Sequence, residues 1–238
     1  MRKSLYIALA AALMVPAIAS AQDNNSGWSG SGEIGLASSK GNTDSQTYVG
    51  KFDIKKDIEK WSYGLGGQFL YTKSDGEESA RRYEAAASAA YNFDDRSYIN
   101  SVLHTQRDHF ATYEYQHSVS VNYGYKLINN DDTRLTMEIG PGYRWAKVQD
   151  ERIHENEVIG RFFADFNQKL TDNTSLYDTL LVESGSSNTY ISNDIGVQVQ
   201  MSKALALKAG YQVHHNTDVV EGTKKTDTLT TVNVVYGF

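Results

Sequence analysis

The stretch of sequence that decides the fold is YEYQHSVSVNYGYKL, residues 113–127. Tyrosine, valine and leucine fill almost every odd position of this stretch, whereas mainly polar or charged residues fill the even positions. Successive side chains of a β-strand point to opposite faces, so the pattern predicts a strand with one apolar and one polar face. The stretch is also longer than the roughly 9 to 11 residues that cross the hydrocarbon core of a membrane at a tilt.

The same alternation recurs on both sides of this stretch. Clear segments cover residues 28–38, 48–55, 61–72, 82–93, 135–145, 158–169, 191–201, 205–213 and 232–238. Residues 97–107 and 175–183 alternate poorly, and the segment at 82–93 belongs to an alanine-rich run over residues 80–90, which favours a helix by propensity alone. Because turn residues bracket all three, we expect them to be strands as well. The sequence therefore predicts about twelve strands.

Composition excludes several classes of protein. The formal net charge is −6, from 23 Lys and Arg against 29 Asp and Glu, which argues against a nucleic-acid binder. The absence of cysteine excludes disulfides, thiolate metal sites and a cysteine nucleophile. The mean hydropathy is −0.50, and beyond residue 15 no apolar run approaches the roughly 18 residues of a spanning helix. The chain has sixteen tyrosines and two prolines, a balance that favours long strands because strands are rich in aromatic residues and exclude proline from their interiors.

The N-terminal residues have the pattern of an export signal. Arg2 and Lys3 precede an apolar run over residues 5–15, and Ala19-Ser20-Ala21 is a small-residue cleavage site. The sequence predicts a signal peptide over residues 1–21, a polar, disordered lead-in over 22–27 and a β-domain over 28–238.

The connections between the predicted strands fall into two classes that alternate along the chain. Residues 59–60, 94–96, 129–132, 171–173 and 202–203 are short turns, and residues 74–79, 149–156, 184–188 and 216–225 are longer or more polar. Outer-membrane barrels have short periplasmic turns and longer outer loops. An even number of strands then leaves both termini on the periplasmic side.

We therefore predict an all-β protein, a transmembrane antiparallel up-and-down β-barrel in the bacterial outer membrane. A soluble sandwich would expose a polar outer face and use shorter strands. The charged residues of the polar face need a hydrated lumen, and in lipid the sheet has to close so that every backbone group is bonded. Pro141 lies within one segment, where it cannot donate to the strand ladder, so we expect a bulge or kink there.

Several short motifs carry a family resemblance. They are Trp28-Ser29-Gly30 with Gly41-Asn42-Thr43-Asp44, Ala80-Arg81-Arg82-Tyr83, Arg107-Asp108-His109-Phe110, Gly140-Pro141-Gly142-Tyr143-Arg144 and Val235-Tyr236-Gly237-Phe238. With these motifs the chain resembles the YdiY-like family of salt-induced outer membrane proteins, domain of unknown function 481. The resemblance spans the chain from residue 28 to its end and implies an outer-membrane β-barrel of Gram-negative bacteria, with no catalytic residues and no established substrate.

The phase of the alternation predicts which charged side chains point into the lumen. They are Glu33, Lys51, Asp53, Lys55, Arg82, Glu84, Glu138, Arg144, Arg161, Asp165 and Lys169. Positive and negative charges nearly balance, whereas an ion-selective pore should carry an excess of one sign. The sequence leaves two functions open: a narrow, weakly selective channel for small hydrophilic solutes, or a barrel plugged by its own charge pairs that serves the envelope without transport.

A hydrolase at the outer rim is a third function. The histidines are His104, His109, His117, His154, His214 and His215, and we expect them to be solvated rim residues. His117 and Ser118 are adjacent, so a strand would place them on opposite faces, the wrong geometry for a base and its nucleophile. We therefore expect no catalysis, and we expect no cofactor. We also expect no metal site, because the Asp94-Asp95 and Asp131-Asp132 pairs lie in turns, where aspartate is favoured for local backbone bonding.

The C-terminal residues and the environment suggest the remaining partners. Tyr236 and Phe238, in phase with the apolar face, resemble the assembly signal of outer-membrane barrels. The expected partners are outer-membrane lipid and lipopolysaccharide, the barrel assembly machinery and small solutes, but no nucleic acid.

Overall fold

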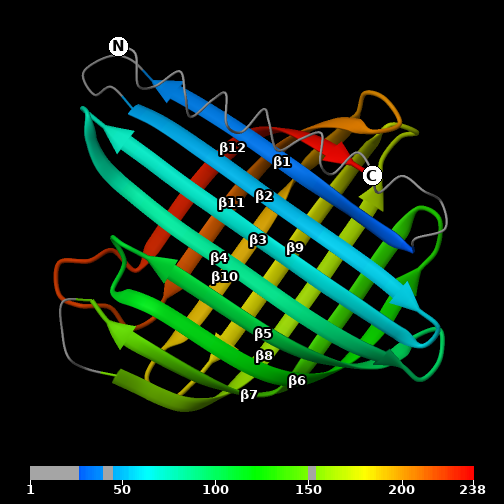
Figure 1. Ribbon diagram of the computed structural model, residues 1–238, viewed down its shortest axis with the longest axis horizontal. Helices are drawn as coiled ribbons and strands as arrows, with labels where there is room; N and C mark the ends of the chain where they lie inside the picture. Colours follow the sequence, from blue (N-terminus) through cyan, green and yellow to red (C-terminus); the bar gives the residue numbers. More distant parts are fainter. Residues whose placement is uncertain (1–26, 40–44, 150–153) are drawn as a thin grey trace.

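The structure, a computed structural model, describes residues 27–39, 45–149 and 154–238. The predicted signal peptide and all but the last residue of the lead-in lie outside these ranges. The described residues form a single closed antiparallel barrel in which each strand pairs with its neighbours in sequence and β1 pairs with β12 (Figure 1). The strands are β1 (Trp28–Ser39), β2 (Ser45–Ile58), β3 (Trp61–Ser74), β4 (Glu77–Asn92), β5 (Ser97–Asp108), β6 (Tyr113–Asn129), β7 (Thr133–Val148), β8 (His154–Lys169), β9 (Thr174–Ser184), β10 (Thr189–Gln200), β11 (Leu205–Asn216) and β12 (Thr226–Gly237).

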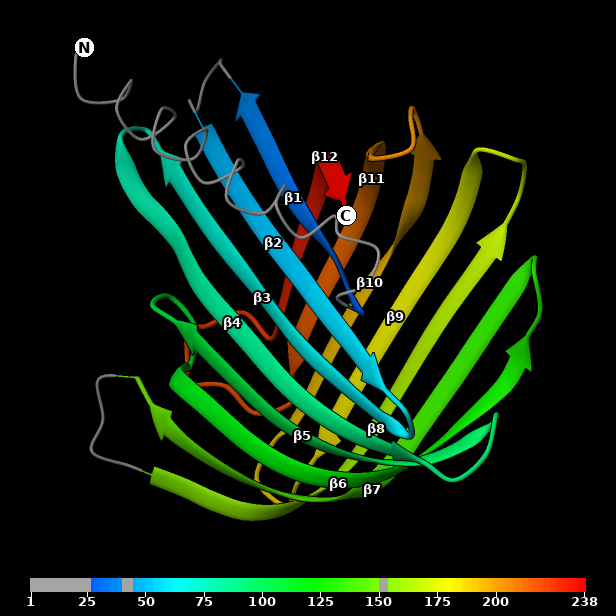
Figure 2. The same ribbon diagram turned by 45° about the vertical axis from the view of Figure 1, so that its right-hand side comes forward.

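The fold class and the strand count predicted from the alternation are confirmed. The front wall of β1–β4 crosses the back wall of β9–β11 at a large angle, as tilted strands of a barrel do (Figure 2). The weakly alternating segments are β5 and β9, and the alanine-rich segment is β4. Among the described residues, no helix has the length and apolar character needed to cross a membrane.

The two ends of the barrel differ. We call the end that carries the connections β2–β3, β4–β5, β6–β7, β8–β9 and β10–β11 the turn end, and the opposite end the loop end. The turn end also carries the start of β1 and the C-terminus, on the right in Figure 1. The longest connection at the loop end joins β11 to β12 over residues 217–225, and it lies on the left in Figure 1.

Side chains are sorted between the two faces of the sheet as the alternation predicts. Apolar residues such as Val158, which is 71% exposed, cover the outer surface. Polar residues such as Asn122, which is fully buried, fill the interior. This arrangement is the reverse of that in a water-soluble protein and is typical of a barrel that faces lipid.

Aromatic rings form two rows on the outer surface. At the turn end Trp61 packs edge-on against Tyr91, with 5.2 Å between ring centroids. Towards the loop end Phe69 lies 5.4 Å from Tyr83 and stacks on Tyr71 at 6.5 Å. Amphipathic rings of this kind gather at the two interfaces of a membrane, so the rows mark the limits of an apolar band.

Local predictions were wrong at two places near the loop end. The connection predicted over residues 74–79 is a tight hairpin turn at Asp75 and Gly76, both with positive φ (52° and 84°), so β3 and β4 extend further than expected. Tyr113 was placed on the apolar face, but a register shift between Tyr113 and Tyr115 turns its side chain inward, where it packs with Ala146 and Val148.

Pro141 does not produce a bulge. Its pairing with Gly160 of β8 belongs to an unbroken register. On the β6 side the register is the same before and after Pro141, and only the pairs at Gly140 and Pro141 are missing from the ladder. A proline without an N–H group is therefore accommodated by a local gap in one ladder.

Candidate functional site in the lumen

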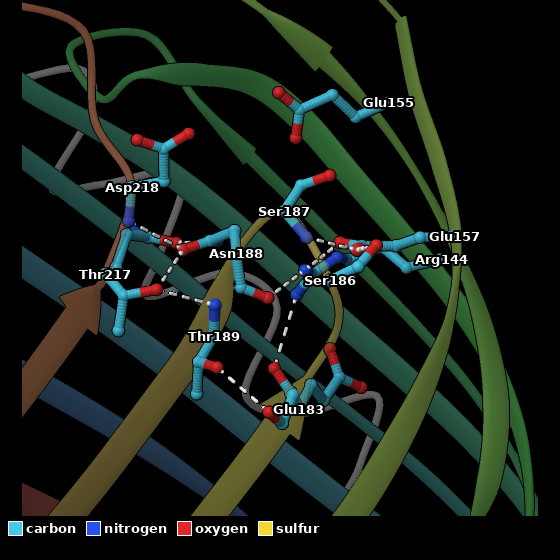
Figure 3. Close-up of polar contacts among 12 residues, drawn as sticks. Arg144, Glu155, Glu157, Glu183, Ser186, Ser187, Asn188, Thr189, Thr217 and Asp218 are labelled. Atoms are coloured by element: carbon cyan, nitrogen blue, oxygen red, sulfur yellow. Dashed lines mark hydrogen bonds and ion pairs between the residues drawn. The ribbon is translucent and has the colours of Figure 1, made fainter.

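A buried polar cluster holds the β9–β10 loop inside the barrel at the loop end (Figure 3). The Arg144 guanidinium, from β7, donates to the Glu157 carboxylate of β8 and to the backbone carbonyl of Asn188. Glu157 in turn accepts hydrogen bonds from the Ser186 hydroxyl at 3.0 Å and from the backbone N–H of Ser187 at 2.7 Å. Arg144 is almost fully buried, so a desolvated ion pair anchors this loop.

The same cluster continues into the β11–β12 loop. The Asn188 amide donates to Asn216 at 2.7 Å and accepts from the backbone N–H of Asp218 at 3.2 Å. Further along this loop the backbone N–H of Val220 donates to the Thr112 hydroxyl at 3.2 Å. Thr112 precedes β6 and Val220 follows β11, so the loop spans the mouth of the barrel.

Side chains from opposite walls also meet across the lumen. His104 of β5 lies 3.8 Å from the Glu183 carboxylate of β9, and His214 of β11 lies 3.8 Å from the Glu84 carboxylate of β4. Neither pair of strands is adjacent in the barrel, so both contacts cross the interior. We call this layer the belt; it consists of Arg82, Glu84, His104, Glu183, Tyr190 and His214.

Tyr190 and Arg82 complete the belt. The Tyr190 hydroxyl lies 2.8 Å from Nδ1 of His214, and its ring stacks on His104 at 6.4 Å between centroids. Arg82 pairs with Asp108 of the neighbouring β5 at 2.6 Å and with Asp227 of β12 at 3.1 Å. Arg82 is therefore held by carboxylates from two different strands.

The lumen contains a separate cavity on each side of the belt. The larger cavity, of about 650 Å³, extends from Asp57 and Lys126 near the turn end to Glu84 and His104. The smaller cavity, of about 410 Å³, lies under the β11–β12 loop and reaches Arg82 and His214. We call the larger cavity the vestibule.

Most of the predicted lumen-facing residues line one of the two cavities. Those that line the vestibule are Glu33, Lys51, Asp53, Lys55, Glu84, Glu138, Arg161 and Asp165. Arg82 lines the smaller cavity, and Arg144 lies in the cluster at the loop end. Lys169 lies at the turn end, where it pairs with Asp172 at 3.3 Å.

Within the vestibule wall many of these charges are paired. Lys51 contacts Asp194 of β10 at 2.6 Å, again between strands that are not adjacent, and Lys208 contacts Glu33 at 2.9 Å. Arg161 contacts Glu138 at 2.9 Å. Asp194 and Lys208, which complete two of these pairs, were not among the residues predicted to face the lumen.

Sequence reasoning missed the histidines of the belt. His104 and His214 were expected to be solvated at the rim, but the structure places both inside the barrel. The phase of β11 could have revealed His214, because it follows the outward Val213. For His104 no such pattern exists, because β5 carries Tyr98 and Val102 on its inner face and Ile99 and Leu103 on its outer face.

The C-terminal residues close the seam of the barrel. Tyr236 pairs in register with Gly32 of β1, and the backbone N–H and C=O groups of Phe238 both bond to Gly30. These contacts place the last residue of the chain on the first strand. The role of Tyr236 and Phe238 as an assembly signal stays a prediction.

Fold and lumen together define an antiparallel twelve-stranded barrel with an apolar outer surface and a polar interior. The family model of the protein of unknown function DUF481 matches residues 32–238. The chain therefore belongs to this family, as the sequence motifs indicated. No curated protein sequence matches the chain.

Several solved structures share the fold. The translocator domain of the autotransporter NalP from Neisseria meningitidis is 14% identical, with a TM-score of 0.52 over 99% of this chain and 96% of that one. The NanC porin is 10% identical, with a TM-score of 0.51 over 87% and 97% of the two chains. The KdgM porin is 11% identical, with a TM-score of 0.50 over 88% and 99%. At this level of identity the likeness concerns the fold alone.

Proposed function

We propose that the protein spans the bacterial outer membrane with its turn end in the periplasm. The apolar outer surface between two rows of aromatic rings supports a lipid environment. The short connections at the turn end, together with the position of the C-terminus there, support the orientation.

Within that membrane we propose that the barrel is occluded and serves the envelope without transport in its resting state. The belt carries this proposal, because its contacts join strands on opposite sides of the lumen. One cavity lies on the turn-end side of the belt and the other on its loop-end side. The loops held at the mouth by Arg144 and Asn188 add a second closure.

Conductance in planar bilayers tests the occlusion. We expect no current steps from the folded wild-type barrel, and steps from the double variant Glu84→Ala, His214→Ala, which removes both partners of one belt contact. Lys55→Ala in the vestibule is the matched control and should stay silent. Steps from the wild type would contradict the occlusion, and silence of a folded double variant would contradict the role of the belt in it.

A gated narrow channel is a second candidate, and one observation favours it. The belt is thin, since Glu84 and His104 line the vestibule while Arg82 and His214 line the cavity on the other side. A rearrangement of a few side chains would therefore join the cavities into a path for small hydrophilic solutes. Reversible opening of the wild type under voltage or acidification would favour this channel over the closed envelope barrel.

We propose no catalytic role. The Ser118 hydroxyl, inside the barrel, donates to Glu183 at 2.7 Å rather than to a histidine. His117 lies on the outer face, stacked on Tyr115 with 4.7 Å between ring centroids. A serine-reactive probe should leave the folded protein unlabelled, and stoichiometric labelling would support a hydrolase instead.

A further inference from the structure

The outer surface of the barrel carries a group of cationic side chains near the loop end on one side only. We call it the cationic arc; it consists of Lys73 on β3, Arg81 on β4, Arg107 on β5 and Lys147 on β7. Residues directly opposite each other in an antiparallel pair share a face. Arg81 is opposite Tyr71, Arg107 is opposite Tyr83, and Lys147 is opposite Tyr115. The arc therefore lies on the outer face of the sheet, as does the aromatic row near the loop end.

The arc carries more positive charge than its own carboxylates neutralise. Arg81 pairs with Glu78 at 3.0 Å. Arg107, at 3.2 Å, and Lys147 share the single carboxylate of Glu114. Lys73 lies 6.0 Å above the centre of the Tyr71 ring. The Arg107 side chain is 58% exposed, so its guanidinium has donors available for a further anion.

The opposite side of the barrel lacks such an outward group in the part that the structure describes, since Lys224 and Lys225 of the β11–β12 loop line the smaller cavity. On β9 to β12 the corresponding outward residues at the loop end are Ser184, Ile191, His215 and Thr226, and His215 bonds to Thr226 at 2.8 Å. An asymmetric arc just beyond aromatic rings places cationic donors at the depth of lipid headgroups.

We propose that the cationic arc binds the phosphate groups of lipid A, the membrane anchor of lipopolysaccharide. The inference rests on the proposed orientation, in which the loop end lies in the outer leaflet. Arginine and lysine form charge-assisted hydrogen bonds with phosphate, and the Arg107 fork can hold two phosphate oxygens at once. Because Arg107 and Lys147 already converge on Glu114, they are spaced to converge on one anion, with Lys73 and Arg81 beside them for a second phosphate.

Native mass spectrometry of the full-length mature barrel in detergent tests the arc. The probes are bisphosphorylated lipid A, dephosphorylated lipid A and phosphatidylglycerol, each added with a chelator so that divalent cations do not bridge. We expect the wild type to prefer bisphosphorylated lipid A over both other lipids. The double variant Arg107→Gln, Lys147→Gln should bind it at least about tenfold more weakly.

The matched control is Lys56→Gln. Lys56 is also an outward lysine over an aromatic ring, 4.7 Å from the centre of Trp28, but it lies at the turn end. This variant should bind lipid A as the wild type does. A second variant, Glu114→Gln, removes the competing carboxylate and should bind lipid A more tightly, which a merely structural role of the arc would not predict.

Three results would overturn the proposal. They are equal binding of lipid A with and without phosphates, unchanged binding by the double variant, and phosphatidylglycerol binding as tight as that of lipid A. The last result would leave a phosphate site without the assignment to lipid A. The mass spectrometry reports on the outer surface alone, and the bilayer experiment reports on the lumen alone. Either proposal can therefore be contradicted by its own experiment without affecting the other.

Discussion

The two halves of the lumen are built from the same strands but are filled differently. Near the loop end Arg144, Glu157 and Asn188 are buried and bonded to one another and to loops that enter the barrel. Near the turn end Lys55 is 64% exposed and pairs with Asp53 at 3.5 Å beside the vestibule. The difference teaches that alternation alone makes a polar interior, and that loops reaching inward decide which of its polar groups are buried and bonded to one another.

Arg144→Ala should have the largest effect on the free energy of unfolding, because it removes the cation of the buried cluster near the loop end. The change leaves the Glu157 carboxylate buried without its cation and removes the donor to the Asn188 carbonyl. Loss of one partner of a buried ion pair destabilises by roughly 3–5 kcal/mol. Urea unfolding followed by tryptophan fluorescence measures the loss. The stability of Lys55→Ala, a change in the wall of the vestibule, should stay within about 0.5 kcal/mol of that of the wild type. Equal losses of stability in the two variants would contradict the contrast between the two halves of the lumen.

Gly124→Ala should have a smaller effect, in the wall of β5 and β6 that faces the vestibule. A Cβ atom at residue 124 would lie 2.2 Å from the Tyr98 ring, whose hydroxyl donates to Glu138 at 2.9 Å. We expect a loss of about 1–3 kcal/mol, because the ring has to move away from its partner. The control is Gly50→Ala, where a Cβ atom meets nothing within 4 Å. The same urea assay compares them, and a neutral Gly124→Ala would show that this wall is loosely packed.

Asp94→Asn should have the smallest effect, because the turn between β4 and β5 lies outside both halves. Hydrogen bonds from the Ser97 hydroxyl and from the backbone N–H groups of Arg96 and Ser97 hold the pKa of the Asp94 carboxyl below its ordinary value of 3.8. A lowered pKa stabilises the fold above pH 3.8, and this stabilisation is lost as the pH falls through the folded-state pKa. The variant should therefore be slightly less stable than the wild type at neutral pH. The difference should shrink in acid, and a difference that grows in acid would contradict this account.

Much of the lumen wall could be read from the sequence because a strand has a period of two. Once the phase of β7 is set by an outward residue such as Ile139, the inward position of Glu138 follows without a partner being known. The phase fails where the backbone inserts a residue, as at Tyr113, since a bulge inverts every side chain beyond it. It is also uninformative where both faces are apolar, as in β5 around Val102.

By itself the sequence determined that this chain forms a closed sheet of about twelve strands with an apolar outside and a polar inside, because that depends on periodicity along each strand. Only the tertiary structure decided which inward groups meet across the lumen. His104 with Glu183, and His214 with Glu84, come from strands on opposite walls, and their contact depends on the diameter and tilt of the barrel rather than on any local pattern. The closure of the barrel therefore brings together belt residues that are far apart in the sequence.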